Sequence, residues 1–130
     1  EGAGLMIVDS GLNLIAQALR DGTSIEIKYI ALGAGNTPPS PSDTKLEDER
    51  FRKPVSRQLP LGTGGTQTIA YIAPHEANDF VIAEIGVFAG DDATDEPDSG
   101  VLIARALYSR QKTPLESLQI TRDDVFGRGN

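Results

Sequence analysis

The alternation of apolar and polar residues from Ser24 to Leu32 restricts the fold more than any other feature of the sequence. A period of two residues is typical of a β-strand that buries one face and exposes the other. The polar face carries Glu26 and Lys28, and the apolar face carries Ile25, Ile27 and Tyr29. The segment therefore predicts a half-buried strand, which needs a second layer of structure against its apolar face.

An amphipathic helix is predicted directly before this strand, over residues 12–20. The side chains that we expect to face the interior are Leu12, Ile15, Ala16 and Leu19, because they recur at helical spacing. Those that we expect to face water are Asn13, Gln17 and Arg20. Ser10 is in position to cap the first turn, and Gly22 is in position to end the helix in a left-handed conformation.

The rest of the chain consists of short apolar segments separated by glycine-rich, proline-rich or acidic loops. Thr44 and Glu47 have capping-box spacing, so the sequence predicts a short second helix over residues 46–51. Further strands are predicted over residues 54–59, 67–73, 80–88, 101–108 and 117–126. The loops between these segments are expected at residues 33–41, 60–66, 75–79 and 90–100.

These elements predict an α+β fold. An N-terminal amphipathic helix and a short second helix would pack on a mostly antiparallel sheet of five to six strands. We expect a single domain over residues 1–126, followed by a frayed tail or linker at residues 127–130.

The composition argues against several classes of function. Twelve basic and nineteen acidic residues give a formal charge of −7, which disfavours binding to nucleic acid or to an anionic membrane. The chain has no cysteine and one histidine, so disulfides and thiolate metal sites are excluded and zinc is nearly excluded. We expect no enzyme activity and no cofactor, and we assign no catalytic, cofactor-binding or metal residue.

Three groups of residues could nevertheless carry chemistry. His75 and Glu76 could form an acid–base pair, although a solvated turn is the favoured interpretation. The glycines at 33 and 35 and at 62–65 superficially resemble phosphate loops, but no helix follows the first pair and no lysine accompanies the second group. They are interpreted as turn glycines. An acidic loop is expected to be solvated, with loose metal binding as the alternative, and its carboxylates are Asp91, Asp92, Asp95, Glu96 and Asp98.

Glu84 stands out because it lies within an otherwise apolar strand. A carboxylate in such a position needs a partner, and the structural ion pair that we expect would use Arg105, Arg50 or Arg52. Gly86, two residues further along the same strand, predicts a bulge or a close approach of another backbone.

Four motifs occur in an order that resembles the N-terminal domain of phage tail-collar fibre proteins. They are GLNLIAQAL at residues 11–19, ALGAG at 31–35, LEDERFR at 46–52 and FVIAEIGVF at 80–88. The resemblance implies a structural component of a contractile-phage or prophage tail, which attaches a tail fibre to the baseplate. It also implies a homotrimer that is made in the cytoplasm of the bacterial host, assembles into the virion tail, and has baseplate or other tail proteins as partners.

Two other functions stay open at this point. A carbohydrate- or receptor-binding module is possible for a sheet-rich tail protein, but the chain has no tryptophan, and Tyr29, Tyr71 and Tyr108 are expected in the core. A glycan-degrading enzyme would need two carboxylates across a cleft, and the acidic residues are numerous enough for the sequence alone to allow it.

Overall fold

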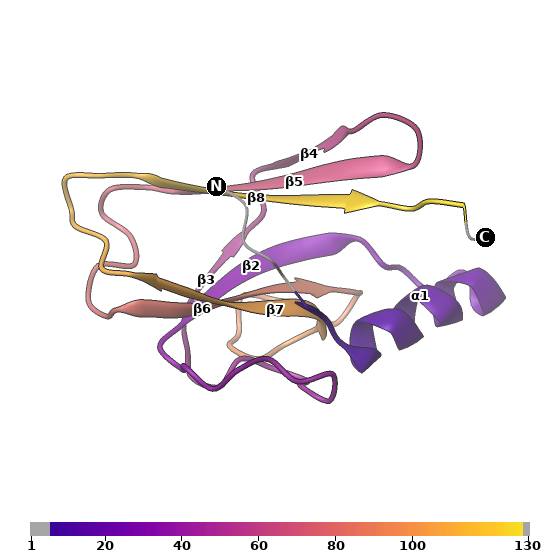
Figure 1. The fold of residues 1–130 in the computed structure, drawn as a ribbon, viewed down its shortest axis with the longest axis horizontal. Coiled ribbons are helices and arrows are strands. Elements are labelled where there is room, and N and C mark those ends of the chain that lie inside the picture. Colours follow the sequence, from indigo (N-terminus) through magenta and orange to yellow (C-terminus); the bar gives the residue numbers. More distant parts are fainter. Residues whose placement is uncertain (1–5, 129–130) are drawn as a thin grey trace.

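The computed structural model describes residues 6–128, which form one α-helix and eight β-strands (Figure 1). In chain order the elements are β1 (Met6–Ile7), α1 (Asp9–Asp21), β2 (Ile27–Gly33), β3 (Glu49–Pro54), β4 (Arg57–Pro60), β5 (Gly65–Ile72), β6 (Ile82–Ala89), β7 (Val101–Arg110) and β8 (Leu118–Val125). No helix in this part of the chain is long and apolar enough to cross a membrane.

The strands form two antiparallel sheets that lie in separate layers (Figure 1). The five-stranded sheet has the order β1-β7-β6-β2-β3, and the three-stranded sheet has the order β4-β5-β8. Helix α1 lies at one end of the larger sheet and contacts β7. The predicted α+β class with a single sheet and two helices is therefore wrong, because the domain is mostly β and contains two sheets.

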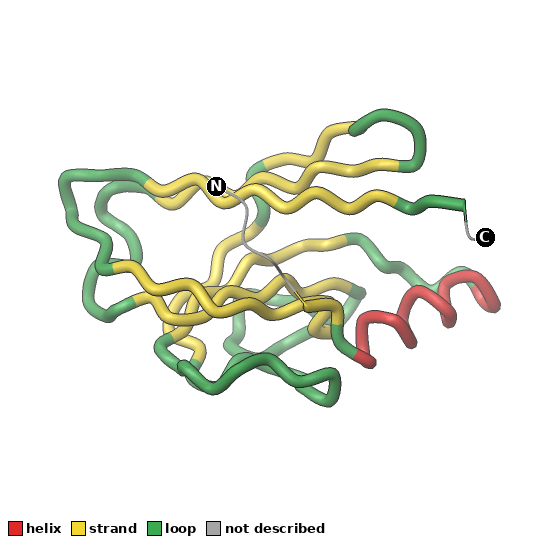
Figure 2. Tube along the Cα trace, in the orientation of Figure 1, coloured by secondary structure: helices red, strands yellow, loops and turns green. Residues whose placement is uncertain are grey.

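The predicted short helix at residues 46–51 is absent, and this segment runs as a loop into β3 (Figure 2). The Glu47 carboxylate does not cap a helix, because it accepts hydrogen bonds from the backbone N–H of Thr37 at 3.0 Å and from its hydroxyl at 2.7 Å. The hydrogen bonds of Thr37 keep the pKa of Glu47 below its ordinary value. Residues from Glu49 onward pair with β2 instead of forming a helical turn.

The main core lies between the two sheets and is aliphatic. It is formed by side chains on the inner face of the larger sheet, on the smaller sheet and on α1, which include Leu14, Ile30, Leu32, Ala70, Ile72, Ile85, Val87, Leu118 and Ile120. A second, smaller cluster lies on the outer face of the larger sheet and contains Val8, Ala31, Leu46, Phe88 and Leu102. Because Leu46 belongs to this cluster, the loop between β2 and β3 covers the outer face.

Helix α1 faces the sheet with a different side from the one predicted. Gly11 and Leu14 are its buried residues, whereas Leu12 and Leu19 are 50% and 85% exposed. Gly11 sets this orientation, because a Cβ atom there would lie 2.6 Å from the carbonyl oxygen of Ile103 on β7. Only glycine lets the helix backbone come this close to the strand. The three side chains predicted to face water are exposed, as expected.

The ends of α1 also differ in part from the prediction. The helix begins at Asp9 after Val8, and no side chain caps it. The hydroxyl of Ser10 donates instead to the carbonyl oxygen of Leu102 at 2.7 Å, so it ties the helix to β7. Gly22 does end the helix in the left-handed region, with a φ of 75°.

Most strands lie near their predicted positions. The exception is the predicted strand at residues 54–59, because β3 ends at Pro54 and the separate strand β4 begins at Arg57. The expectation that all three tyrosines are in the core is also wrong for Tyr71, which is 44% exposed. Residues 129–130 of the expected tail lie outside the described residues, as do residues 1–5.

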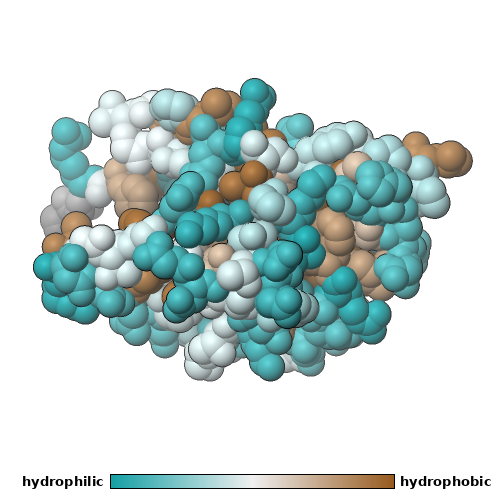
Figure 3. All heavy atoms as spheres, turned by 180° about the vertical axis from the view of Figure 1, so that it is seen from behind, coloured by the Kyte–Doolittle hydropathy of each residue, from teal (hydrophilic) through white to brown (hydrophobic). Residues whose placement is uncertain are grey.

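The surface of the domain is mainly polar. On the face opposite to that of Figure 1, hydrophilic side chains predominate and apolar atoms show in separate patches between them (Figure 3). This agrees with the formal charge of −7, since acidic side chains are expected at the surface.

Candidate functional site

The carboxylate of Glu84 is the centre of a buried polar cluster on the outer face of the larger sheet. The side chain is 0% exposed, and each of its oxygens accepts two hydrogen bonds. One oxygen accepts from Arg105 Nε at 2.8 Å and from the backbone N–H of Glu47 at 2.9 Å. The other accepts from the backbone N–H groups of Gly35 and Asp48, both at 2.8 Å. The carboxylate therefore holds the loop between β2 and β3 as well as an ion-pair partner.

Arg105 extends this cluster to a second carboxylate. Its Nη1 donates to Asp43 Oδ2 at 3.2 Å, and the same oxygen accepts from the backbone N–H of Ser40 at 2.9 Å. The ion pair predicted for Glu84 is confirmed with Arg105, whereas Arg50 pairs with Asp48 outside the cluster. The Glu84 cluster, defined as Glu84, Arg105 and Asp43, fastens the covering loop to the sheet at several points.

Close packing around the Glu84 cluster explains the glycines of the ALGAG motif. A Cβ atom on Gly33 would lie 2.5 Å from the Asp48 carbonyl oxygen, and one on Gly35 would lie 2.6 Å from Glu84 Oε2. These positions are thus restricted by contacts, and no phosphate is needed to explain them. At Gly86 the close neighbour is a side chain, because a Cβ atom there would lie 2.7 Å from Leu46 Cδ2.

A second buried ion pair organises the acidic loop. Arg52 Nε donates to Glu49 Oε2 at 2.7 Å, and the side chains of both residues are almost fully buried. Arg52 Nη1 also donates to the carbonyl oxygens of Thr94 and Ser99, at 3.0 and 2.9 Å. The guanidinium lies 4.3 Å from the centroid of the Phe88 ring, a distance typical of a cation–π contact. Arg52 therefore holds the acidic loop onto the outer face of the sheet.

The carboxylates of the acidic loop do not converge on a common point. Asp91 lies 3.8 Å from Lys28, and Asp98 lies 4.0 Å from Lys45, so two of the five pair with separate lysines. Within residues 6–128 no group of three or more His, Cys, Asp or Glu side chains is arranged to hold a metal ion. The backbone of the loop is instead fixed by Arg52 and Glu49, whose Oε1 accepts from the N–H of Asp98 at 3.1 Å.

The only histidine lies exposed in the turn between β5 and β6, beside Glu76. Glu76 Oε1 accepts from Lys53 Nζ at 2.7 Å and from the backbone N–H of Ala73 at 2.8 Å. Burial alone would raise the pKa of Glu76, but these hydrogen bonds outweigh burial and hold it below its ordinary value. Glu76 is therefore a turn residue that anchors β3, and its contacts differ from those of an acid–base partner of His75.

The glycines at 62–65 form the turn of the hairpin between β4 and β5. Gly62 and Gly64 have φ angles of 61° and 73°, in the left-handed region that favours glycine. The N–H of Leu61 donates to the carbonyl oxygen of Gly65 at 3.0 Å, which closes the turn. The interpretation of these residues as turn glycines is thus confirmed.

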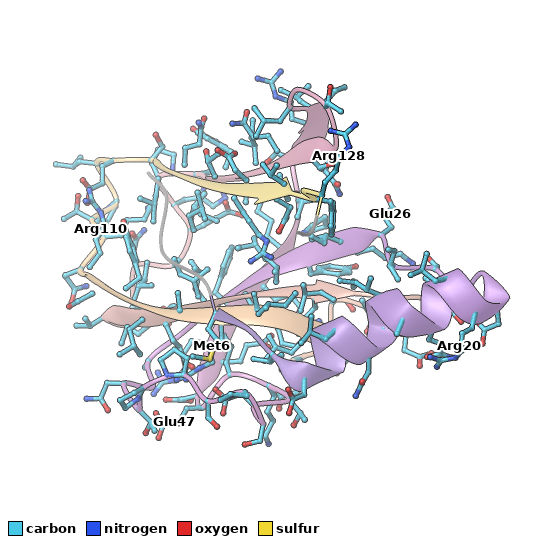
Figure 4. All side chains as sticks on the ribbon, turned by 45° about the vertical axis from the view of Figure 1, so that its right-hand side comes forward. Met6, Arg20, Glu26, Glu47, Arg110 and Arg128 are labelled. Atoms are coloured by element: carbon cyan, nitrogen blue, oxygen red, sulfur yellow. The ribbon has the colours of Figure 1, made fainter. Side chains whose placement is uncertain are left out.

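An apolar groove opens between the two sheets beside α1. It has a volume of about 730 Å³ and is lined on one side by five isoleucines from separate parts of the chain, namely Ile7, Ile15, Ile25, Ile27 and Ile103. On the other side it is lined by residues 121–126, which include the whole C-terminal half of β8. We call this the β8 groove. Glu26 also lines the groove and lies above α1 in Figure 4.

Several of these residues were not singled out from the sequence. Asp43 gave no signal beyond its charge, because it lies in a loop of serine and proline far from its partner in the chain. Lys112 is buried, and its ammonium donates to the Pro74 carbonyl oxygen at 2.8 Å and to Asn78 Oδ1 at 2.9 Å. Glu49 lies in the segment predicted as a short helix, and Arg52 is predicted only as a possible partner of Glu84, so the pair that they form was not predicted.

No curated protein matches the chain. The sequence model of a family described as phage tail-collar fibre protein, N-terminal, matches residues 3–116. This span contains every element from β1 to β7, and β8 follows it. The resemblance of the four ordered motifs is confirmed. The chain belongs to the phage tail-collar fibre protein family, of which it carries the N-terminal domain, and it is a tail fibre component of a phage tail.

Proposed function

We propose that this domain attaches a tail fibre to the baseplate of a contractile phage or of a related prophage particle. The observation that carries the proposal is the family match over residues 3–116. A tail fibre has to be joined to the rest of the tail, and an N-terminal domain with a buried core between two sheets is suited to this task.

The buried charges of the domain support a structural role. Glu84, Arg105 and Lys112 are almost fully buried, and each forms hydrogen bonds to loop backbone or to a buried partner. A catalytic carboxylate or amine has to reach a substrate, whereas these groups are engaged in holding loops. We therefore propose that the domain has no catalytic activity.

The carbohydrate-binding alternative has weaker support. Sugars are commonly held by stacking on aromatic rings, and among residues 6–128 the exposed aromatic side chains are Tyr71 and Phe126. Lys53 Nζ lies 5.7 Å from the centroid of the Tyr71 ring, so a cation already occupies one face of that ring.

Further parts of the proposal rest on the family resemblance. The chain would be one domain over residues 1–126, would form a homotrimer, and would have baseplate or other tail proteins as its partners. It would be made in the bacterial host cytoplasm and be incorporated into the virion tail. Nucleic acid and membranes are not proposed as partners, because the chain is acidic.

Immunogold electron microscopy tests the proposal directly. An antibody against this domain is applied to tail-like particles from an induced producer culture, with particles from a strain that lacks the gene as the control. We expect gold at the distal, baseplate end of the tails and none on the control particles. Label along the whole tail, or only in the soluble fraction, would contradict the proposed attachment.

A further inference from the structure

The β8 groove leaves apolar side chains in contact with solvent. Val125 and Phe126 are each 66% exposed, and Ile7 and Ile25 are exposed to a lesser degree. These side chains come from different segments of the chain but line one continuous groove. Exposed apolar side chains that gather in one groove offer a surface for a protein–protein contact.

The shape of the groove favours an extended occupant. Six consecutive residues, from Thr121 to Phe126, line it, so the groove runs along β8. Among the described residues β8 pairs only with β5, which makes it the edge of the smaller sheet. Because an edge strand presents backbone N–H and C=O groups, a partner segment can add to it as a further strand.

The side chains of β8 that point toward the larger sheet change from apolar to charged along the strand, and the core ends where they change. Leu118 and Ile120 are buried between the sheets, and the next residues on the same side are Arg122 and Asp124. Arg122 donates to both carboxylate oxygens of Asp124, at 2.8 and 2.6 Å. An unpaired charged side chain that points inward from an edge strand would disfavour the addition of another strand. Arg122 and Asp124 neutralise each other, so they do not have this effect.

The remaining charges of the groove are negative. Glu26 and Asp123 have no cation within 4.0 Å among residues 6–128, although Asp123 accepts a hydrogen bond from Gln67 at 3.0 Å. Arg128 lies near the same end and forms no ion pair with a described carboxylate (Figure 4). Glu26 and Asp123 outnumber this one cation, so a basic partner complements this end of the groove, whereas a second copy of a chain with a charge of −7 does not.

We infer that the β8 groove binds an extended, basic segment of the tail protein to which the domain attaches. The segment adds as a strand to β8, its apolar side chains enter the groove, and its lysines or arginines lie beside Glu26 and Asp123. This inference rests on the proposed attachment function and names the surface and the chemistry of that contact.

Cysteine labelling in assembled tails tests the surface, because the chain contains no cysteine of its own. Val125→Cys places a thiol in the groove, and Leu115→Cys, at a residue 94% exposed in the turn before β8, is the matched control. The rate of maleimide labelling is measured for the full chain before and after its assembly into tails. We expect at least a tenfold slower rate for Val125→Cys in tails and an unchanged rate for Leu115→Cys.

A short maleimide–amine cross-linker on Val125→Cys tests the occupant. We expect a cross-link to a lysine of another tail protein, located by mass spectrometry. A cross-link between two copies of this chain would overturn the inference in favour of self-association. Unchanged labelling of Val125→Cys in tails that contain the chain would overturn the groove contact but leave the attachment function standing. Tails that do not contain the chain would overturn both.

Charge reversal tests the electrostatic part of the contact. Glu26→Lys should reduce incorporation of the chain into tails several-fold. The substitution replaces a negative charge at the groove with a positive one, which repels a basic partner segment. Asp92→Lys makes the same change in net charge within the acidic loop and should leave incorporation unchanged. Equal incorporation of the two variants would contradict a basic occupant.

Discussion

The Glu84 cluster gives the sharpest test of the fold, because the substitution Glu84→Gln keeps the shape of the side chain and removes its charge. The two carboxylate oxygens accept four hydrogen bonds, two each. A glutamine amide has one oxygen, so in either orientation its NH₂ group faces two donors. Each buried donor left without an acceptor costs about 1–3 kcal/mol, which gives about 2–6 kcal/mol for the pair.

The loss of the ion pair leads to a similar figure. In either orientation Arg105 would stay buried with Asp43 as its one remaining anionic partner in the Glu84 cluster, and removing one partner of a buried ion pair costs about 3–5 kcal/mol. We therefore expect Glu84→Gln to lower the free energy of unfolding by about 3–5 kcal/mol. This is a large part of the roughly 5–15 kcal/mol by which domains are stable.

Urea unfolding followed by far-ultraviolet circular dichroism measures this loss, since the chain has no tryptophan for fluorescence. Glu96→Gln removes the same charge from an exposed position in the acidic loop and should leave the midpoint unchanged. Asp43→Asn, which removes the negative charge from the longer contact to Arg105, should give an intermediate loss and provides the test if Glu84→Gln does not fold. A loss below about 1 kcal/mol for Glu84→Gln would refute the buried-acceptor argument.

Three further predictions concern separate parts of the domain. Gly35→Ala should lower the melting temperature, because the new Cβ would lie 2.6 Å from a buried carboxylate oxygen; an unchanged temperature would show that the loop can shift. Arg52→Lys should speed hydrogen exchange in residues 90–100 without unfolding the sheets, because lysine cannot make the forked contacts of the guanidinium. The folded-state pKa of Glu76 is lowered, so its contribution to stability is present above its unfolded pKa and is lost as pH falls through the folded value. Acid unfolding of Glu76→Gln should therefore depend less steeply on pH in that range, and an identical pH profile would exclude the contribution.

Features that follow from a residue's own chemistry and its local sequence were predictable. Gly22 ends α1 as expected, because a left-handed residue after a helix is a local requirement. The pairing of Glu84 was also predictable, since a carboxylate in an apolar strand cannot stay buried without a partner. The sequence offered three arginines for this role, and only the packing of β6 against β7 selects Arg105.

The second helix was mispredicted because a local pattern lost to contacts from distant strands. Residues 44–51 have the spacing of a capped helix, but the backbone N–H groups of Glu47 and Asp48 find an acceptor in Glu84, which is 36 or more residues away. The face of α1 was mispredicted for a related reason. Apolar residues occur on more than one side of this helix, and the close contact of Gly11 with β7 decides which side is buried.

The division into two sheets has no local signature, because strands of either sheet show similar lengths and alternation. β4 pairs with β5 as a hairpin, but β8 reaches β5 from 46 or more residues away. The same pairing creates the β8 groove, since it brings residues 121–126 opposite isoleucines from the first 27 residues and from β7. A surface that is built from both ends of the chain follows from topology and cannot be found by scanning one segment at a time.

Buried charge and exposed apolar surface in this domain have complementary explanations. The larger sheet is covered on its outer face by loops. The backbone N–H groups of these loops are not paired within a β-sheet and need other hydrogen-bond acceptors. Glu84, Glu49 and Arg52 supply hydrogen-bond partners to those loops from within the sheet, so polar residues occur where an apolar layer would otherwise lie. At the β8 groove the situation is reversed, because apolar side chains lie at an edge with no described segment over them. The loops on the outer face are held by residues of the domain itself, whereas the exposed edge at the β8 groove is what a partner strand would cover.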